Sequence, residues 1–223
     1  MAPRNPPTHP ATGPSAGEGL DVEYFFYCRD RPGTMPLREQ LVEDHWSFMD
    51  RYADTMIARG PTLSADESIA TGSVHFVDLP GADAARVFAF EEPNYRAGVY
   101  ADVLIRRWRN MLGRTMWEFG EAIADGCGFL ILGHGRPGMT AAHDELGDEH
   151  RRYLAAGSLA DRLIASGPLL SDDGSEWAGT AMLAELPGRA AAEAILADSP
   201  YARAGLYDSI EVHNWQPGGR PQD

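Results

Sequence analysis

Residues 60–81 read GPTLSADESIATGSVHFVDLPG, and residues 167–188 read GPLLSDDGSEWAGTAMLAELPG. The two stretches open on the same Gly-Pro, share a Leu-Ser pair and close on the same Leu-Pro-Gly. A β-rich run precedes each closing turn, so each stretch is typical of strands bounded by turns. This recurrence makes an internal duplication the first hypothesis about the fold.

The matches continue outward from these two stretches in the same order. Arg-Pro-Gly stands at 31–33 and again at 136–138, and Tyr100 and Trp108 recur as Tyr207 and Trp215. So many ordered matches at a nearly constant spacing indicate two copies of one unit. The sequence therefore predicts two domains, with flanking segments, at residues 21–110 and 126–217, a disordered leader at 1–20, a helical linker at 111–125 and a tail at 218–223.

Each unit is expected to contain two helices and four strands. In the first unit the strands are expected at residues 22–28, 62–64, 73–79 and 103–108, and the helices at 37–58 and 82–90. The order β-α-β-β-α-β is that of the α+β, ferredoxin-like arrangement, in which an antiparallel sheet carries both helices on one face. Two fused ferredoxin-like domains would then pack sheet to sheet as a pseudo-dimer.

Composition excludes several classes of protein. The chain has 33 acidic residues against 19 Lys and Arg, a formal net charge of −14, which argues against nucleic acid or an anionic membrane as partner. Two cysteines form no disulfide framework, and no secretory signal is visible, so a cytoplasmic location is expected. The histidines form no metal-ligand pattern and no phosphate-binding Gly motif occurs, so neither metal nor cofactor is expected.

His45 and His150 lie at equivalent positions on apolar helix faces. An imidazole oriented by a carboxylate could move a proton near neutral pH, whereas a purely structural histidine would pack and bond to backbone. Trp46 could line a pocket for a planar ligand or serve packing. Arg96 and Arg203 could offer a cation to an anionic substrate or act in a turn.

Several of these segments resemble the YCII (YciI-like) family. The cues are the Arg-Pro-Gly turn, the helix histidine, GPLLSDDG at 167–174 and SPYARAGL at 199–206. The resemblance implies a dimeric α/β barrel-like core with a cleft between helix and sheet that holds a His, an Asp and a nearby Ser. It also implies a possible activity, since one family activity is the dehydrochlorination of chlorinated hydroxyhydroquinones.

The family's site residues map unevenly onto the two copies. Its Ser matches Ser73 in the first copy and Thr180 in the second. Its Asp, which precedes a Pro, matches Glu92 in the first copy and Ser199 in the second, where Asp198 stands one residue earlier. Neither copy keeps the full set, so the sequence leaves open which copy is active.

The leading hypothesis is a cofactor-independent lyase or isomerase acting on a small aromatic or polyhydroxylated compound. Elimination, isomerisation, dehydration and cyclisation are the reactions considered, with bacterial secondary metabolism as the expected setting. The alternatives are a non-catalytic small-molecule-binding protein and a cofactor-free monooxygenase on the same scaffold. Because each copy can cover the sheet of the other, a monomer or a weak homodimer is expected.

Overall fold

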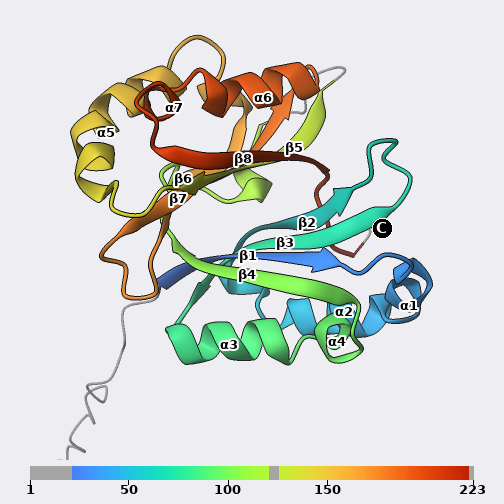
Figure 1. Ribbon diagram of the computed structural model, residues 1–223. Helices are drawn as coiled ribbons and strands as arrows, with labels where there is room; N and C mark the ends of the chain where they lie inside the picture. The colour runs from blue at the N-terminus through green and yellow to red at the C-terminus, as the bar shows by residue number, and fades with distance from the viewer. Residues whose placement is uncertain (1–21, 121–125, 221–223) are drawn as a thin grey trace, which may run out of the picture.

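The computed structural model describes residues 22–120 and 126–220, and the leader predicted at 1–20 lies outside them. Two halves of the same design lie back to back, with their strands in the middle and their helices outside (Figure 1). The first half contains β1 (Val22–Asp30), α1 (Met35–Gln40), α2 (Val42–Asp50), the 3-10 turn η1 (Ala53–Thr55), β2 (Met56–Leu63), β3 (Ala70–Leu79), α3 (Ala82–Phe90), α4 (Pro93–Arg96) and β4 (Tyr100–Trp108). The 3-10 turn η2 (Met116–Glu118) follows, and the second half contains β5 (Cys127–Gly135), α5 (Thr140–Leu154), the 3-10 turn η3 (Ala160–Arg162), β6 (Leu163–Leu170), β7 (Trp177–Leu186), α6 (Arg189–Ala197), α7 (Pro200–Arg203) and β8 (Tyr207–Trp215).

The strands form one closed barrel in the order β1-β3-β2-β8-β5-β7-β6-β4. Within each half the neighbours are antiparallel, as the ferredoxin-like prediction requires. The halves are joined at two short seams, where Thr62 and Leu63 of β2 pair with β8, and Arg107 and Trp108 of β4 pair with β6. The pairing therefore goes further than sheet-to-sheet packing, because each half hydrogen-bonds the strand edges of the other.

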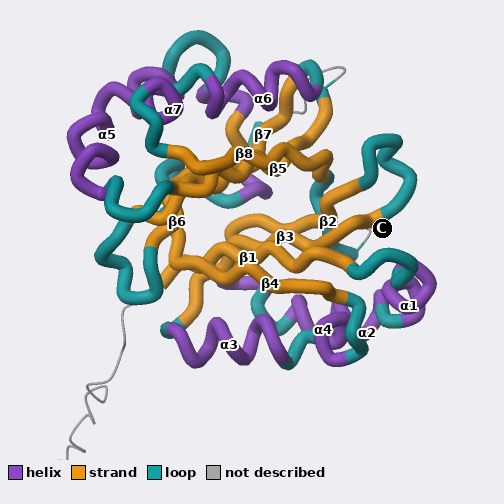
Figure 2. Tube along the Cα trace, viewed as in Figure 1, coloured by secondary structure: helices purple, strands orange, loops and turns teal. Residues whose placement is uncertain are grey.

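Alternation along the strands separates three layers of apolar side chains. On β1, Phe25 and Tyr27 face the barrel interior, where they join Trp108 and Trp215, while Phe26 packs under the helices of the first half. Successive strand residues point to opposite faces, so one strand serves both layers. The strands lie between the two helix layers in the view of Figure 2. Removing these three layers from water supplies the main stabilisation of the fold.

The long helix predicted over residues 37–58 is wrong in extent. The helical segment breaks at Leu41 and ends at Asp50, and Met56 to Leu63 form β2 instead of the short strand predicted at 62–64. Met56, Ile57 and Ala58 are buried on the sheet, and a short apolar run fits a buried strand as well as a helix face. The Gly-Pro pair therefore lies inside the strand and does not begin it.

The segments flanking the second half also differ from expectation. Within residues 111–120, the described part of the predicted helical linker, there is the 3-10 turn η2, in which Thr115 and Glu118 form a capping box; residues 121–125 lie outside the described part. Residues 218–220, predicted to belong to a tail, pack against the first half. They contact the other half of the barrel, and local composition gives no sign of such a long-range contact.

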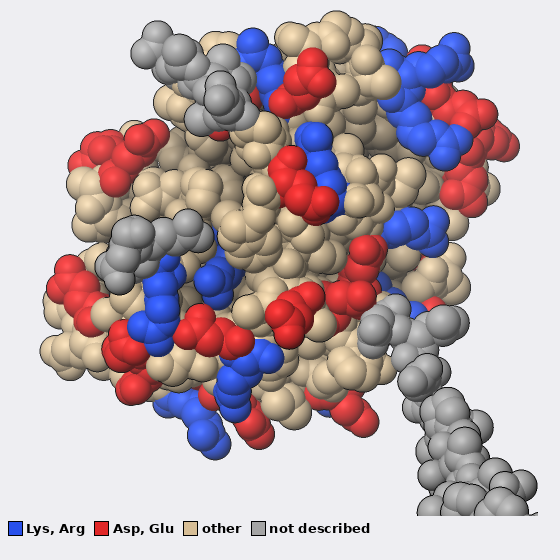
Figure 3. Space-filling view, turned by 180° about the vertical axis from the view of Figure 1, so that it is seen from behind, with Lys and Arg blue, Asp and Glu red and all other residues tan. Residues whose placement is uncertain are grey.

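The surface carries charges of both signs. On the face seen in Figure 3, acidic and basic side chains are interspersed over the described residues, without a broad basic area. None of the helices within residues 22–120 and 126–220 is both long and apolar enough to cross a membrane.

Candidate functional site

A cavity of about 380 Å³ opens in the first repeat between the helices α1 and α2 and the strands β2 and β3. Helix residues Arg38, His45 and Trp46 line one side of it, and Ser73 and His75 of β3 line another. Strand alternation places Ser73 and His75 on the same face, toward the helices. Two of the predicted catalytic residues and one predicted binding residue therefore share one cavity.

His45 and Glu92 form a close pair at this cavity. Nδ1 of His45 lies 2.6 Å from Oε1 of Glu92, and only 3% of the Glu92 side chain is exposed. Glu92 stands directly before α4, where its Oε2 accepts a hydrogen bond of 2.9 Å from the backbone N–H of Tyr95. This N-cap contact fixes the carboxylate on the short helix, so Glu92 can hold the imidazole in one orientation.

The surroundings of Glu92 favour its charged form. Burial, the largest influence, raises its pKa, but the hydrogen bond and charge of His45 and the N–H of Tyr95 bring the pKa below its usual value. An ionised Glu92 can only accept, so the neutral imidazole carries its proton on Nδ1 and keeps Nε2 as a proton acceptor. The pair has the form of a general base with its orienting carboxylate.

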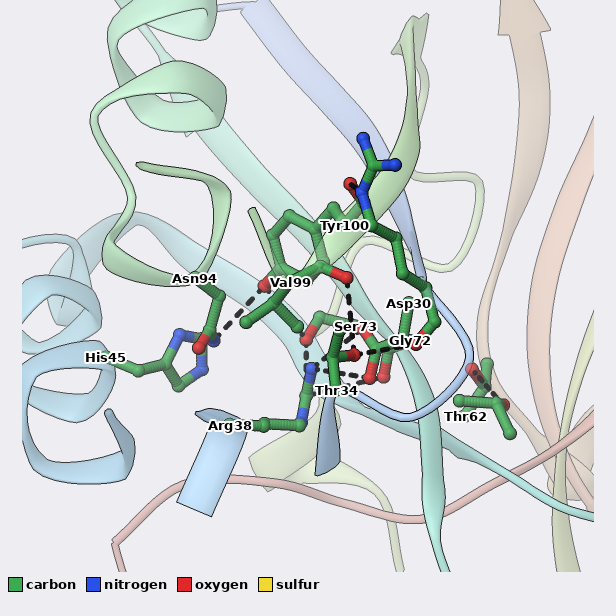
Figure 4. A network of polar contacts seen from close by, with 12 residues as sticks. Asp30, Thr34, Arg38, His45, Thr62, Gly72, Ser73, Asn94, Val99 and Tyr100 are labelled. Carbon is green, nitrogen blue, oxygen red and sulfur yellow. Dashed lines mark hydrogen bonds and ion pairs between the residues drawn. The ribbon is translucent and has the colours of Figure 1, made fainter. Parts of the chain in front are cut away.

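A second polar group lies beside this pair. Arg38 makes an ion pair with Asp30, with 3.1 Å between Nη1 and Oδ1, and its Nη2 donates to Oγ of Ser73 at 2.6 Å. The hydroxyl of Tyr100 donates to the same Ser73 oxygen at 3.3 Å, and Asn94 donates to Tyr100 at 3.4 Å. Figure 4 shows Arg38 below Ser73 and Tyr100, with His45 to one side. A guanidinium and a hydroxyl so placed can hold a substrate oxygen that becomes negative.

Burial shifts the pKa values of Asp30 and His75, two groups beside this pair. It is the largest influence on Asp30, whose pKa rises to about 6 even though Arg38 opposes the shift. It also lowers the pKa of His75 well below the usual value, and the charge of His45, whose ring centroid lies 6.1 Å away, adds to this. His75 is therefore neutral near pH 7, and its Nδ1 has no hydrogen-bond partner within the described part of the chain.

The equivalent site of the second repeat lacks the carboxylate. Ser199 occupies the position of Glu92 and caps α7 through a hydrogen bond from the N–H of Ala202. Burial and the neighbouring His143 lower the pKa of His150 to about 4, and its ring stacks on Tyr201 with 3.9 Å between centroids. Asp198 ends α6 and makes no hydrogen bond or ion pair with His150 among residues 126–220.

Other parts of the network are also missing from the second repeat. The positions of Asp30, Arg38 and His75 are taken by Gly135, His143 and Met182. Thr180 bonds to the Tyr207 hydroxyl at 2.9 Å, as Ser73 does to Tyr100, and both Thr180 and His150 line a smaller cavity of about 250 Å³. The geometry thus distinguishes the two copies, whereas the sequence left open which of them is active.

The two predicted substrate-binding arginines lie away from these cavities. Arg96 is exposed at the end of α4, among residues of a shallow surface depression. Arg203 is exposed and pairs with Glu149 at 3.4 Å. They are placed as turn and surface residues, which is the alternative that the sequence kept open for them.

Asp30, Arg38 and Tyr100 were not singled out from the sequence. In the helix predicted over residues 37–58, Arg38 stands two turns before His45, which would place both on one face. This spacing could have identified Arg38 as a site residue. Asp30 lies on a different strand from Ser73, and only the fold brings the two near Arg38. Within residues 22–120 and 126–220, no three His, Cys, Asp or Glu side chains are grouped to hold a metal ion.

This chain belongs to the YCII-related domain family. The family model matches it twice, at residues 22–109 and 128–216, close to the predicted domain bounds. A protein of uncharacterised function from Haemophilus influenzae is 26% identical over 95 residues, which are 40% of this chain and 97% of that protein. The tandem arrangement predicted from the repeat is confirmed.

Solved structures give the same result for the fold. A 5-chloro-2-hydroxyhydroquinone dehydrochlorinase from Burkholderia phenoliruptrix, in complex with 2,5-dihydroxybenzoquinone, is 25% identical, over 42% of this chain and 99% of that chain, with a TM-score of 0.39. An anthrone oxidase-like protein matches 90% of this chain and 92% of its own, with 12% identity and a TM-score of 0.53. A chlorite dismutase variant from Candidatus Nitrospira defluvii matches 87% and 91%, with 12% identity and a TM-score of 0.55. The last two likenesses extend across both halves and confirm the double ferredoxin-like fold.

Proposed function

We propose that the first repeat is the catalytic one and that it moves a proton on a small hydroxylated aromatic compound. The observation that carries this proposal is the 2.6 Å contact between His45 Nδ1 and Glu92 Oε1, beside a cavity that Arg38 and Ser73 also line. In the second repeat a serine replaces the carboxylate, and its histidine is neutral near pH 7. Among the described residues, the helix histidine pairs with a buried carboxylate in the first repeat alone; the second cavity does hold a His143–Asp144 pair, but 70% of the Asp144 side chain is exposed.

In an elimination, each group has a defined task. Nε2 of His45 accepts the substrate proton, the electron pair of the broken bond forms the new double bond, and the leaving group departs with its own bonding pair. Glu92 stabilises the imidazolium that forms. Arg38 and Ser73 bind the substrate oxygen, and Trp46 offers an aromatic wall to the ring. These steps use groups of the chain alone, in keeping with the expectation of a cofactor-independent enzyme.

The test measures whether the whole chain turns over any member of a panel of compounds. The panel consists of hydroquinones, hydroxyhydroquinones and their chlorinated derivatives. Chlorinated hydroxyhydroquinones come first because the family resemblance suggested them. His45→Gln and Glu92→Ser should each lower kcat/KM by about 100-fold or more, as loss of a general base does. The matched variant His150→Gln should keep the wild-type rate, and equal losses in both repeats would contradict the assignment.

A ligand-binding role is the second candidate, and the second repeat favours it. Its cavity keeps a hydroxyl, from Thr180, and the aromatic surface of Tyr201, and no carboxylate among residues 126–220 pairs with His150. Binding of panel compounds without turnover in any variant would support this role for the whole chain. Oxygen consumption with a phenolic substrate would instead support the monooxygenase alternative.

A further inference from the structure

The segment that follows β8 crosses into the other half of the molecule. The backbone N–H of Gln216 donates to the carbonyl of Pro61 at 3.3 Å, and that of Gly218 donates to the carbonyl of Arg59 at 3.0 Å. Residues 216–219 then line the cavity that holds His45. The C-terminal end of the second repeat thus forms a wall of the site in the first. We call residues 216–220 the strap.

Arg220 fastens the strap to the helix that carries His45. Its guanidinium donates to Oδ2 of Asp50 at 2.9 Å, to Oε2 of Glu43 at 2.9 Å and to Oγ of Ser47 at 3.1 Å. It also lies 5.6 Å from the ring centroid of Trp46, within the range of a cation–π contact. All four partners are on α2. Because these pairs are solvent-exposed, each is weak and the attachment can open.

The second repeat shows the same crossing without the fastening. After β4, the N–H of Arg109 donates to Pro168 and that of Met111 donates to Ser166, at 3.3 and 2.9 Å. Met111 lines the smaller cavity at the position that Gly218 has in the larger one. The counterpart of Arg220 is Gly113, which has no side chain to reach α5. The fastening is therefore particular to the repeat that carries the His45–Glu92 pair.

We propose that the strap determines which substrates enter the first repeat, with Arg220 as the latch that holds it across the cavity. This rests on the proposed function, because it assigns a specificity wall to that same site. The wall consists of Gln216, Pro217 and two glycines, so it is thin. Two backbone hydrogen bonds hold it to β2, and Arg220 ties it to α2. Because the wall closes one side of the cavity of about 380 Å³ that His45 lines, its position limits how far a ligand can extend past His45, and a second fused ring should be affected more than a single ring.

The strap's position is tested first by hydrogen exchange, which needs no turnover. In Arg220→Gln, the Gly218 amide should exchange at least several-fold faster than in the wild type, while amides of β1 keep their rates. The double variant Glu43→Gln/Asp50→Asn removes the latch from the helix side and should give the same result. Arg189→Gln is the matched control, because Arg189 is an exposed, ion-paired arginine on α6. Unchanged Gly218 exchange in both latch variants overturns the proposal.

The specificity role is tested by the binding of two probes. The single-ring probe is 2,5-dihydroxybenzoquinone and the fused-ring probe is 2-hydroxy-1,4-naphthoquinone. The affinity of each probe is measured by calorimetric titration, with the latch substitutions introduced both into the wild type and into His45→Gln. Both latch variants should raise the ratio of fused-ring to single-ring affinity about fivefold or more, and Arg189→Gln should leave it unchanged. A ratio unchanged in both latch variants overturns the role. His45→Gln should not move the ratio, so failure of the catalytic proposal and failure of the strap are told apart.

Discussion

At the scale of the residue, the side chain at one N-cap position decides whether the helix histidine of a repeat has a carboxylate partner. Glu92 and Ser199 occupy the same N-cap position and both satisfy the helix start, so the local fold accepts either. Only the carboxylate reaches a histidine, and it is 97% buried in doing so. A buried charge is retained only with partners, and here the partners are His45 and a backbone N–H. The proposed catalytic difference between the copies therefore needs no change in the backbone.

Asp30 gives a stability test at this scale. Burial raises its folded-state pKa to about 6, above the value near 4 expected in the unfolded chain. Between these pH values the folded state binds more protons than the unfolded state, so the free energy of unfolding should fall as pH rises from 4 to 6. For this side chain the loss should be on the order of 1–2 kcal/mol after allowance for solvent screening. Urea unfolding from pH 4 to 6 should show it in the wild type and not in Asp30→Asn; parallel pH curves for the two proteins would contradict the assignment.

At the scale of the element, sequence periodicity predicted most strands of the first unit and its helix at 82–90, whose bounds the structure reproduces. It failed for β2, because Met56 to Ala58 are apolar enough for either a helix or a buried strand. It also passed over α4, which has only four residues and is capped by Glu92. Asp30, Arg38 and Ser73 meet through three separate elements, so no local pattern could have joined them.

The Gly-Pro pairs inside β2 and β6 give a second stability test. A Cβ on Gly60 would overlap the carbonyl oxygen of Gln216 in the strap crossing. Gly60→Ala should therefore lower the free energy of unfolding by about 1–3 kcal/mol, as overpacking does. Gly188→Ala is the control, because its backbone is extended and a Cβ there meets no atom within 4 Å. Chemical denaturation checks both variants, and equal stabilities would show that the crossing is not tightly packed.

At the scale of the whole molecule, duplication has placed both halves of a closed barrel in one chain. The two seams, β2 with β8 and β4 with β6, use the strand edges that separate subunits would otherwise pair. The repeat in the sequence predicted this pseudo-dimer, although it could not predict that each half also walls the cavity of the other. Those crossings depend on a barrel closure that no single copy contains.

Because the sheets already cover each other, the chain is expected to be a monomer or a weak homodimer. Sedimentation equilibrium at micromolar concentration should give a mass near 24.3 kDa. A stable dimer or tetramer at micromolar concentration would mean that a further surface is used. A surface other than the two barrel sheets would then have to account for the association of chains.

The most direct test of the central claim is the protonation of the two site histidines, read by nitrogen-15 NMR of labelled imidazoles at pH 8. His45 should carry its proton on Nδ1, and the hydrogen bond to Glu92 should shift the resonance of that proton strongly downfield. That signal should disappear in Glu92→Ser, which places the residue of the second repeat in the first, and His150 should show no such proton in either protein. A His45 ring protonated on Nε2, or a downfield proton that survives Glu92→Ser, would contradict the account.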